Sequence, residues 1–452
     1  MQCQYTGVHQ YTMSTVQPQA QILTVSTHMS SSKANARQPP CPHRHLTTGR
    51  TRGFRNVSRR TPALRRLTKL NDKTNSDCLS RSRVVRGRSL CETTAQRTPT
   101  VLVACSSAAS ESSALLKSVR NGPLAGKVAI VTGCDRGLGR HIAESLVAKG
   151  ASVQMACIDT EPATRTRDEL NQTYPGANVV LAPRLDLADM SSVRKVAEWF
   201  LAFDEPLDIL VNNAGANFFA KEWYTAAGIG GCAQINFLGP YFLTRLLVPA
   251  LLKGSEPRVV SVASVMHRFT SLTDPDAFLK EWGAGGYRAA KLAVVLFTKE
   301  LQRRLPGVTS VAVDPGSVYS GIWDTSTSFG RPPLVWLLQV CYAPVHDGAA
   351  APIHAATIPT NQLVPGGYYA RGMFRSAFLS ATPFTAGGIL HQLACLVCSL
   401  LDWPLRRLLR GHAGTAVTSA VSAAPTTDDT QLSARMWEAA AAAAQLPSEI
   451  ES

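Results

Sequence analysis

A tyrosine and a lysine four positions apart, Tyr287 and Lys291, are the residues of this chain best suited to proton transfer. Residues 286–305 have amphipathic helical spacing, and positions i and i+4 of a helix share a face, so the ammonium would stand beside the phenol. A free phenol has a pKa of about 10. A nearby fixed cation stabilises the phenolate and lowers that pKa. The pair therefore predicts a general acid/base for alcohol–carbonyl interconversion, although such pairs also occur by chance on surface helices.

A glycine-rich loop is the second group of residues with a chemical use. The apolar run at residues 128–131 is typical of a buried strand, and apolar positions at helical spacing follow from Ile142. Between them lie Gly133, Gly137 and Gly139. A strand, a glycine loop and a helix together place a pyrophosphate on free backbone N–H groups. This order predicts a dinucleotide site; an ordinary glycine-rich loop is the alternative.

The elements that position both groups alternate between strand and helix patterns from about residue 126. The pattern predicts an α/β fold, a Rossmann doubly wound parallel sheet forming a single catalytic domain with a C-terminal insert. We expect strands at 128–131, 152–157, 178–185, 207–211, 258–262 and 308–313. We expect helices at 161–174, 190–203, 233–252 and 286–305.

The positive charge of the chain is concentrated before this domain. Residues 1–105 hold 14 Arg and 3 Lys against three acidic residues, whereas the whole chain has a net charge of +15. The remainder is therefore nearly neutral, which argues against a nucleic-acid partner. A Ser-, Thr- and Arg-rich segment poor in acid is typical of an organelle transit peptide. We expect chloroplast targeting, to the stroma or the envelope; mitochondrial targeting and a disordered basic arm are the alternatives.

The remaining boundaries follow from composition. We expect a disordered transit peptide at 1–105, a linker at 106–124, the catalytic domain at 125–375, an apolar and basic insert with a linker at 376–430, and a final helix at 431–452. Residues 376–410 combine an apolar run with a basic amphipathic piece, which suits either peripheral contact with a membrane or a helix covering the active site. Scattered cysteines favour a reducing compartment, and the pair Cys395 and Cys398 has no second ligand pair, so no metal site is expected.

Taken together, five blocks resemble the short-chain dehydrogenase/reductase family, and within it the retinol-dehydrogenase-like group. The resemblance covers about residues 125–375 and the terminal residues 436–438. The blocks are Thr132 to Gly139, Asp186-Leu187, Asn212-Asn-Ala-Gly215, Ile235 to Thr244, and Tyr287 to Leu301, with Asp314-Pro-Gly316 closing the sixth strand.

The resemblance implies a catalytic role for four side chains. Tyr287 would be the acid/base, and Lys291 would lower its pKa and bind the nicotinamide ribose. Ser264 would hydrogen-bond the substrate oxygen, and Asn236 would support a proton relay through a water. Ser261 competes with Ser264, but it lies within the predicted strand, whereas Ser264 lies just beyond the carboxyl end, where ligands bind in open α/β sheets.

The resemblance also implies a nicotinamide dinucleotide cofactor. The expected binding residues are Gly133, Asp135, Arg136, Gly137, Leu138, Gly139, Asp186, Leu187, Asn212, Ala214, Gly215, Tyr287, Lys291, Pro315 and Gly316. Arg136 can pair with a 2′-phosphate and favours NADP. Asp159, 20 residues after Gly139, would favour NAD by the general fingerprint, and Ile158 stands where the group tends to carry an Arg. We expect NADP, with NAD possible.

The apolar residues between Pro315 and Tyr342, where the family builds its substrate lid, suggest a lipophilic small molecule as substrate. Another reading is a regulatory NADP(H) sensor, because the chain also resembles the dehydrogenase subunit of the chloroplast inner-envelope translocon. In that reading residues 376–430 would dock on other proteins. The sequence predicts no particular substrate, reaction direction or oligomeric state.

Overall fold

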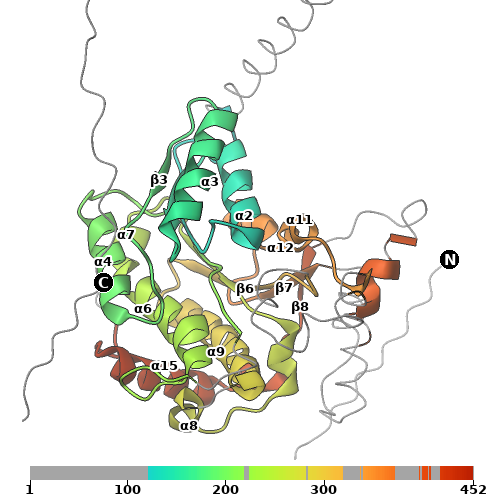
Figure 1. Cartoon of the computed structure of the whole chain (residues 1–452). Helices are drawn as coiled ribbons and strands as arrows, with labels where there is room; N and C mark the ends of the chain where they lie inside the picture. The colour runs from blue at the N-terminus through green and yellow to red at the C-terminus, as the bar shows by residue number, and fades with distance from the viewer. Residues whose placement is uncertain are drawn as a thin grey trace, which may run out of the picture. The chain divides into compact units, whose positions relative to one another are not determined.

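A mixed sheet of eight strands forms the centre of the molecule (Figure 1). The computed structural model describes residues 121–217, 223–280, 283–318, 336, 340–371, 397, 400–405, 407–408 and 418–450, and every structural statement below concerns these residues. The strand order is β3-β2-β1-β4-β5-β6-β7-β8. The strands are β1 (Val128–Thr132), β2 (Ser152–Ala156), β3 (Val179–Leu181), β4 (Ile209–Asn212), β5 (Arg258–Val262), β6 (Thr309–Asp314), β7 (Tyr368–Arg371) and β8 (Thr418–Val421).

Helices cover both faces of the sheet, which explains why strands β1, β4 and β5 are buried along nearly their whole length. One face packs against α2 (Gly137–Ala148), α3 (Thr160–Thr173), α11 (Val345–Gly348) and α12 (Ala350–Thr357). The other packs against α4 (Met190–Leu201), α6 (Gly239–Leu246) and α9 (Gly283–Arg304), with α8 (Pro275–Leu279) beside α9 (Figure 1). This is the Rossmann-like α/β fold that the alternating pattern predicted.

The strand order reverses between β1 and β4, and this reversal creates the crevice in which ligands of such sheets bind. β1 pairs in parallel with β2 on one side and with β4 on the other. The chain leaves β1 toward α2 on one face and leaves β4 toward α6 on the other. The carboxyl ends of β1, β4, β5 and β6 therefore surround one opening.

One predicted helix is divided into several pieces. The segment predicted as a helix at 233–252 consists of α5 (Gly231–Ala233), the π-helix η1 (Gln234–Leu238), α6 and α7 (Val248–Leu251). Pro240 and Pro249 are the second residues of α6 and α7. Each lies in the first turn of its helix, where a missing N–H costs little. A π-helical turn widens the backbone by one residue, and such turns are frequent at functional sites.

Two strands lie beyond the last one that the sequence predicted. β7 continues the parallel sheet beside β6, and β8 returns antiparallel beside β7, with Arg371 opposite Thr418. β8 and the short helix η5 (Pro425–Asp428) lie inside the range 376–430 that was interpreted as insert and linker. Residues 1–120, Cys395, Cys398 and most of 376–410 lie outside the described residues. Among the helices described, none is long and apolar enough to cross a membrane.

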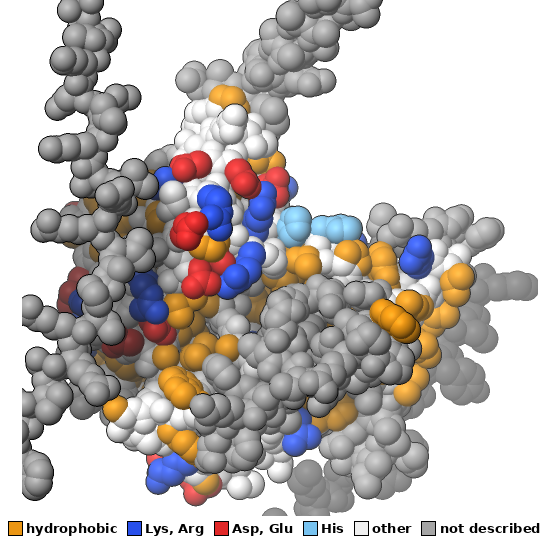
Figure 2. Space-filling view, in the orientation of Figure 1, with side chains coloured by type: hydrophobic (Ala, Val, Ile, Leu, Met, Phe, Trp, Pro, Cys, Tyr) orange, Lys and Arg blue, Asp and Glu red, His pale blue; other side chains and the backbone are white. Residues whose placement is uncertain are grey.

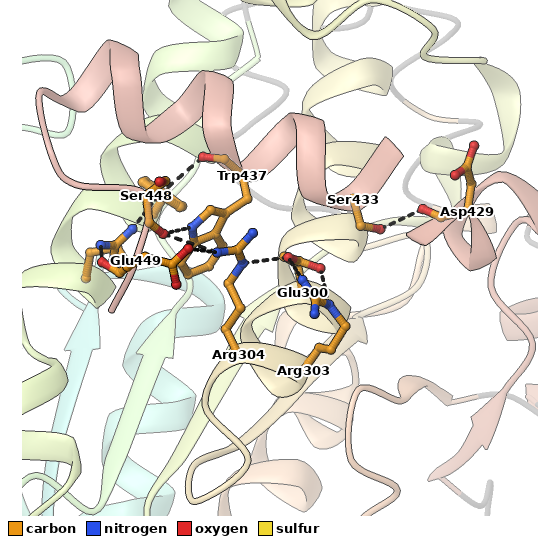
Figure 3. A network of polar contacts seen from close by, with 10 residues as sticks. Glu300, Arg303, Arg304, Asp429, Ser433, Trp437, Ser448 and Glu449 are labelled. Carbon is orange, nitrogen blue, oxygen red and sulfur yellow. Dashed lines mark hydrogen bonds and ion pairs between the residues drawn. The ribbon is translucent and has the colours of Figure 1, made fainter. Parts of the chain in front are cut away.

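The C-terminal helix α15 (Thr430–Ala444) packs across α9 and is held there by one buried network (Figure 3). Glu300, 1% exposed, binds Arg303 and Arg304 on its own helix. The Arg304 guanidinium lies 5.1 Å from the Trp437 ring centroid, and the indole N–H donates to the Ser448 carbonyl at 2.7 Å. Trp437 is fully buried between α6 and α9, so the end of the chain belongs to the catalytic core.

Candidate active site

The glycine turn joins β1 to α2 and has two different requirements for glycine. Gly133 and Gly137 have φ of +61° and +60°, a region that other residues adopt only at a cost. Gly139 is needed for space, because a Cβ there would lie 2.1 Å from the Gly133 carbonyl oxygen. The backbone therefore closes tightly on itself and leaves the N–H groups of the first turn of α2 available for an anion.

The loop after β4 is fastened to this turn. The Thr132 hydroxyl accepts hydrogen bonds from the N–H groups of Asn213 and Ala214, at 3.0 and 2.9 Å. The Asn213 amide donates to the carbonyls of Thr132 and Gly133, at 2.9 and 3.0 Å. The two sides of the crevice are thus set before any ligand arrives. Thr132 and Asn213 were not among the predicted site residues, although their place beside the glycine loop and after an apolar strand was visible.

The predicted acid/base residues meet at the carboxyl end of β5. Tyr287 and Lys291 lie one turn apart on α9, with the Lys291 Nζ 5.6 Å from the Tyr287 ring centroid. The Tyr287 phenol interacts with the Ser264 side chain, which follows β5 at the start of η2 (Val265–Phe269). Lys291 is 5% exposed and donates to the Val262 carbonyl at 2.7 Å. The Tyr287 phenol, the Ser264 hydroxyl and the Lys291 ammonium therefore lie close together.

Asn236 reaches the same point from the π-helix. Its side chain accepts from the Ala216 N–H at 3.1 Å and donates to the carbonyls of Ala216 and Cys232, at 2.8 and 2.9 Å. A Cβ added at Gly215 would lie 2.7 Å from the Asn236 Oδ1 and 3.8 Å from the Lys291 Nζ. The bare Gly215 backbone is thus the common neighbour of both side chains.

Ser261 and Ser264 face different surroundings. Ser261 lies within β5, is 3% exposed, and lines a small cavity together with Asn212, Asn236 and Val262. Ser264 contacts Tyr287. The geometry therefore brings Ser264, and not Ser261, to the phenol, in agreement with the preference drawn from strand position.

The electrostatics of the phenol differ from the sequence-based expectation. Burial and the Asp314 carboxylate raise the pKa of Tyr287, and the Ser264 side chain only partly opposes them. Lys291 is not among the groups that shift this pKa here, so the lowering of the Tyr287 pKa by Lys291 stays a prediction. Burial lowers the pKa of Lys291 itself to about 8, although Asp314 and Cys232 act in the opposite direction. The effect of burial was not predicted, because i, i+4 spacing says nothing about desolvation.

The remaining predicted cofactor residues border the crevice, and most also have structural partners. The Asp135 carbonyl accepts from Thr166 of α3, and Leu138 lies beside Gly348 of α11. The Asp186 carboxylate accepts from the Ala188 N–H and pairs with Arg184. The Leu187 carbonyl accepts from Gln234, and the Asn212 amide donates to Thr244 of α6. Ala214 packs against Gly133, and Pro315 and Gly316 follow β6, with Gly316 at φ +89°.

Arg136 and Asp159, the residues that compete over cofactor choice, form an ion pair. The Arg136 Nη2 lies 2.6 Å from the Asp159 Oδ2, and the Arg136 Nε lies 3.2 Å from the Asp135 carboxylate. Figure 2 shows side chains of both charges interspersed over this part of the surface. The guanidinium is thus held beside the end of β2, where the adenosine half of a dinucleotide would lie in a sheet of this type.

No group of three His, Cys, Asp or Glu side chains in the described part of the chain is placed to hold a metal ion. The residues present do fit a dinucleotide: a glycine turn at a helix N-terminus, a bare Gly215 backbone, and a buried ammonium beside it. An acid/base phenol next to such a crevice defines a nicotinamide-dependent oxidoreductase of the Rossmann class.

Comparison with known proteins gives the family. A model of the short chain dehydrogenase family matches residues 127–329. Human retinol dehydrogenase 11 is 36% identical over 254 residues, covering 54% of this chain and 77% of that protein. Human retinol dehydrogenase 12 is 35% identical over 257 residues, covering 55% of this chain and 79% of that protein. The chain belongs to the short-chain dehydrogenase/reductase family and is an NAD(P)-dependent oxidoreductase.

A solved structure supports the fold alone. The crystal structure of an uncharacterized protein from Mycobacterium paratuberculosis superposes with a TM-score of 0.51 at 23% identity, covering 73% of this chain and 96% of that one.

Proposed function

We propose that the protein is an NADP-dependent oxidoreductase that transfers hydride between the nicotinamide and an alcohol or carbonyl carbon of a lipophilic small molecule. The observation that carries this proposal is the meeting of the Tyr287 phenol, the Ser264 side chain and the buried Lys291 ammonium at the carboxyl end of β5, beside the glycine turn. In this constellation a proton donor, an oxygen-binding hydroxyl and a fixed cation surround one substrate oxygen.

The bound dinucleotide supplies or accepts the hydride, and the protein handles the proton. During carbonyl reduction the Ser264 hydroxyl holds the substrate oxygen, and Tyr287 donates its phenolic proton to that oxygen. Lys291 stabilises the phenolate that remains, and it would also hold the ribose hydroxyls of a bound dinucleotide. Asn236 keeps the π-helical backbone in place and would support a proton relay through a water near Lys291. Alcohol oxidation follows the same path in reverse.

NADP is proposed as the preferred cofactor because of Arg136. This guanidinium is 68% exposed and already lies next to the expected adenosine position, so it can turn from Asp159 to a 2′-phosphate. NAD remains possible, because Asp159 could instead accept a hydrogen bond from a ribose hydroxyl. The named activity of the retinol dehydrogenases supports an apolar alcohol or aldehyde as substrate class.

The proposal is tested with purified protein, first by titrating NADPH and NADH, and then by assaying reduction of retinal and an aliphatic aldehyde with the preferred cofactor. We expect turnover that Tyr287→Phe abolishes while cofactor binding persists. Cofactor binding without turnover of any carbonyl would refute the enzymatic proposal and leave a binding function. Turnover that survives in Tyr287→Phe would refute the assignment of the acid/base.

Peripheral contact with an anionic membrane is a separate proposal for the segment around residue 400. Val397, Leu401 and Leu408 are 49, 46 and 80% exposed, and their spacing places them on one side of a helix, with Arg407 nearby. Figure 2 shows hydrophobic side chains along the right-hand rim, where Figure 1 draws these helical residues. Leu408→Glu should reduce sedimentation with phosphatidylglycerol vesicles, whereas Leu252→Glu, a control at an exposed leucine of another surface, should not. Equal sedimentation of all three proteins would refute the contact.

We also propose that residues 1–105 direct the protein to the chloroplast and that 106–124 link them to a catalytic domain at 125–375, to whose sheet and core β8 and α15 add residues from 376–430 and 431–452. The support is the basic, acid-poor composition of the first segment. Fusion of residues 1–105 to a fluorescent protein tests the targeting. Import by isolated chloroplasts is expected, and import only by mitochondria would favour the alternative.

A further inference from the structure

A buried carboxylate, Asp314, ends β6 within the wall of the active site. It is 1% exposed. One oxygen accepts from the Gly316 N–H at 3.0 Å, and the other accepts from the Tyr368 hydroxyl at 2.6 Å. Both partners are donors, which is the arrangement that an ionised carboxylate requires, and the short phenol contact is typical of a charge-assisted hydrogen bond. The carboxylate is therefore fixed in position by two hydrogen-bond donors.

The sheet register places this charge next to the acid/base pair. Val262 of β5 is opposite Val313 of β6, and the Val262 carbonyl is the acceptor for the Lys291 ammonium. Asp314 is the next residue after Val313, so the carboxylate and the ammonium belong to neighbouring strand ends. The Asp314 charge accordingly raises the pKa of both Lys291 and Tyr287.

The other polar groups around Asp314 are held by partners of their own. His267 of η2 donates from Nδ1 to the Ser264 carbonyl at 2.7 Å and accepts at Nε2 from the Ala424 N–H at 3.1 Å, so both ring nitrogens have partners. The Arg268 guanidinium donates to the Ser422 carbonyl and lies 6.0 Å from the Tyr368 ring centroid. Among the described residues, Cys232 of α5 and the phenol of Tyr342 also act on the Tyr287 phenol.

We propose that Asp314 is a positioning residue that keeps Lys291 charged and Tyr287 protonated at neutral pH, and so biases the site toward carbonyl reduction. This inference rests on the proposed function, because it takes Tyr287 to be the acid/base. Burial alone favours a neutral amine at Lys291, and the nearby carboxylate opposes that effect. The same negative charge disfavours the phenolate. Reduction starts from the phenol, whereas oxidation needs the phenolate.

The chemical balance of the favoured direction is simple. Hydride from the reduced nicotinamide adds to the carbonyl carbon, and the phenolic proton passes to the carbonyl oxygen. The dinucleotide is oxidised, the carbonyl compound is reduced to an alcohol, and the phenolate regains a proton from water. A pre-protonated Tyr287 is therefore an advantage only in this direction.

Asp314→Asn keeps the shape of the side chain and removes its charge. The phenol and the ammonium both lose their protons as the pH rises. Without the Asp314 charge they should do so at lower pH, so the basic limb of the pH profile of kcat/KM for carbonyl reduction should move to lower pH, by about one unit for a close buried charge. Asp314→Glu should restore the wild-type limb, and Tyr368→Phe, which removes a partner but leaves the carboxylate, should move it less. A uniform loss of activity without a shift would overturn the proposal and leave Asp314 a structural residue.

A second measurement needs neither cofactor nor turnover. The pKa of Lys291 is lowered from 10.5 to about 8 in the fold, so the unfolded chain binds more protons between these values and stability rises with pH there. Lys291→Met should remove this rise from a plot of the melting temperature against pH. In the Asp314→Asn background the rise that depends on Lys291 should begin at lower pH; an unchanged onset would overturn the proposal.

The two tests separate this inference from the proposed function. An active Tyr287→Phe enzyme would refute the role of Tyr287, while the unfolding curves would still report the effect of Asp314 on Lys291. An inactive Tyr287→Phe enzyme combined with an unshifted Asp314→Asn profile would refute the inference alone. Asp314→Ser is a second neutral variant, for use if the Asn protein does not fold.

Discussion

Replacing Gly139 with alanine tests whether the glycine turn is closed by contact within the protein. Position 139 is in the first turn of α2, where alanine would normally be favoured over glycine by about 1 kcal/mol. Here the new Cβ would lie 2.1 Å from the Gly133 carbonyl oxygen and 2.5 Å from the Asn213 amide nitrogen. Neither atom is free to move, since the Asn213 amide bonds the carbonyls of Thr132 and Gly133.

Relief of this clash requires α2 or the β4 loop to shift. Overpacking typically costs about 1 to 3 kcal/mol, and we expect the upper end here because backbone must move. The contact therefore outweighs the helix propensity, and we expect Gly139→Ala to lose about 2 kcal/mol or more of unfolding free energy. Urea unfolding with an unchanged m-value measures this loss, and fluorescence titration with NADPH should show weaker binding.

Two matched variants separate backbone strain from contact. Gly137 and Gly228 have φ of +60° and +75°, and a Cβ added at either position would have no other atom within 4 Å. Alanine at either position should cost about 1 to 2 kcal/mol through backbone conformation alone. Of these two variants, only Gly137→Ala should also weaken NADPH binding, because Gly137 belongs to the glycine turn between β1 and α2. A Gly139→Ala protein as stable as the wild type, or more stable, would refute the reasoning.

Three further outcomes are expected. Arg136→Ala should weaken NADPH binding about tenfold or more and leave NADH binding nearly unchanged; equal losses in two parallel titrations would remove Arg136 from cofactor selection. Ser264→Ala should lower kcat about a hundredfold at unchanged cofactor affinity, whereas Ser261→Ala should alter stability more than kcat, as steady-state kinetics and urea unfolding will show. Trp437→Ala should lower the free energy of unfolding by about 3 to 5 kcal/mol, and a loss below about 1 kcal/mol would contradict the anchoring of α15.

The elements best predicted from the sequence were those whose pattern is local. The run at 128–131, the three glycines and the helix after them occupy adjacent positions, and β1, the turn and α2 follow them closely. Likewise, Tyr287 and Lys291 could be placed together because one helix carries both. Spacing along one element survives folding unchanged.

The features that escaped prediction depend on partners far away in the chain. β8 is the four-residue segment Thr418–Val421, and only pairing with β7 makes it a strand. Asp314 was interpreted as the end of a strand, since nothing near it in sequence indicates that Tyr368 and Lys291 would surround it. The raised pKa of Tyr287 was missed for the same reason, because burial is a property of the assembled layers.

The pairing of Arg371 with Thr418 has a practical consequence for protein engineering. Arg371 is the last residue of β7 and Thr418 the first of β8, and the two are paired, so residues 372–417 connect two adjacent strand ends. The entropy of closing such a connection grows only slowly with its length. A two-residue Asn-Gly hairpin should therefore substitute for it and yield a shorter enzyme, and a reporter domain with neighbouring termini should be accepted at the same junction.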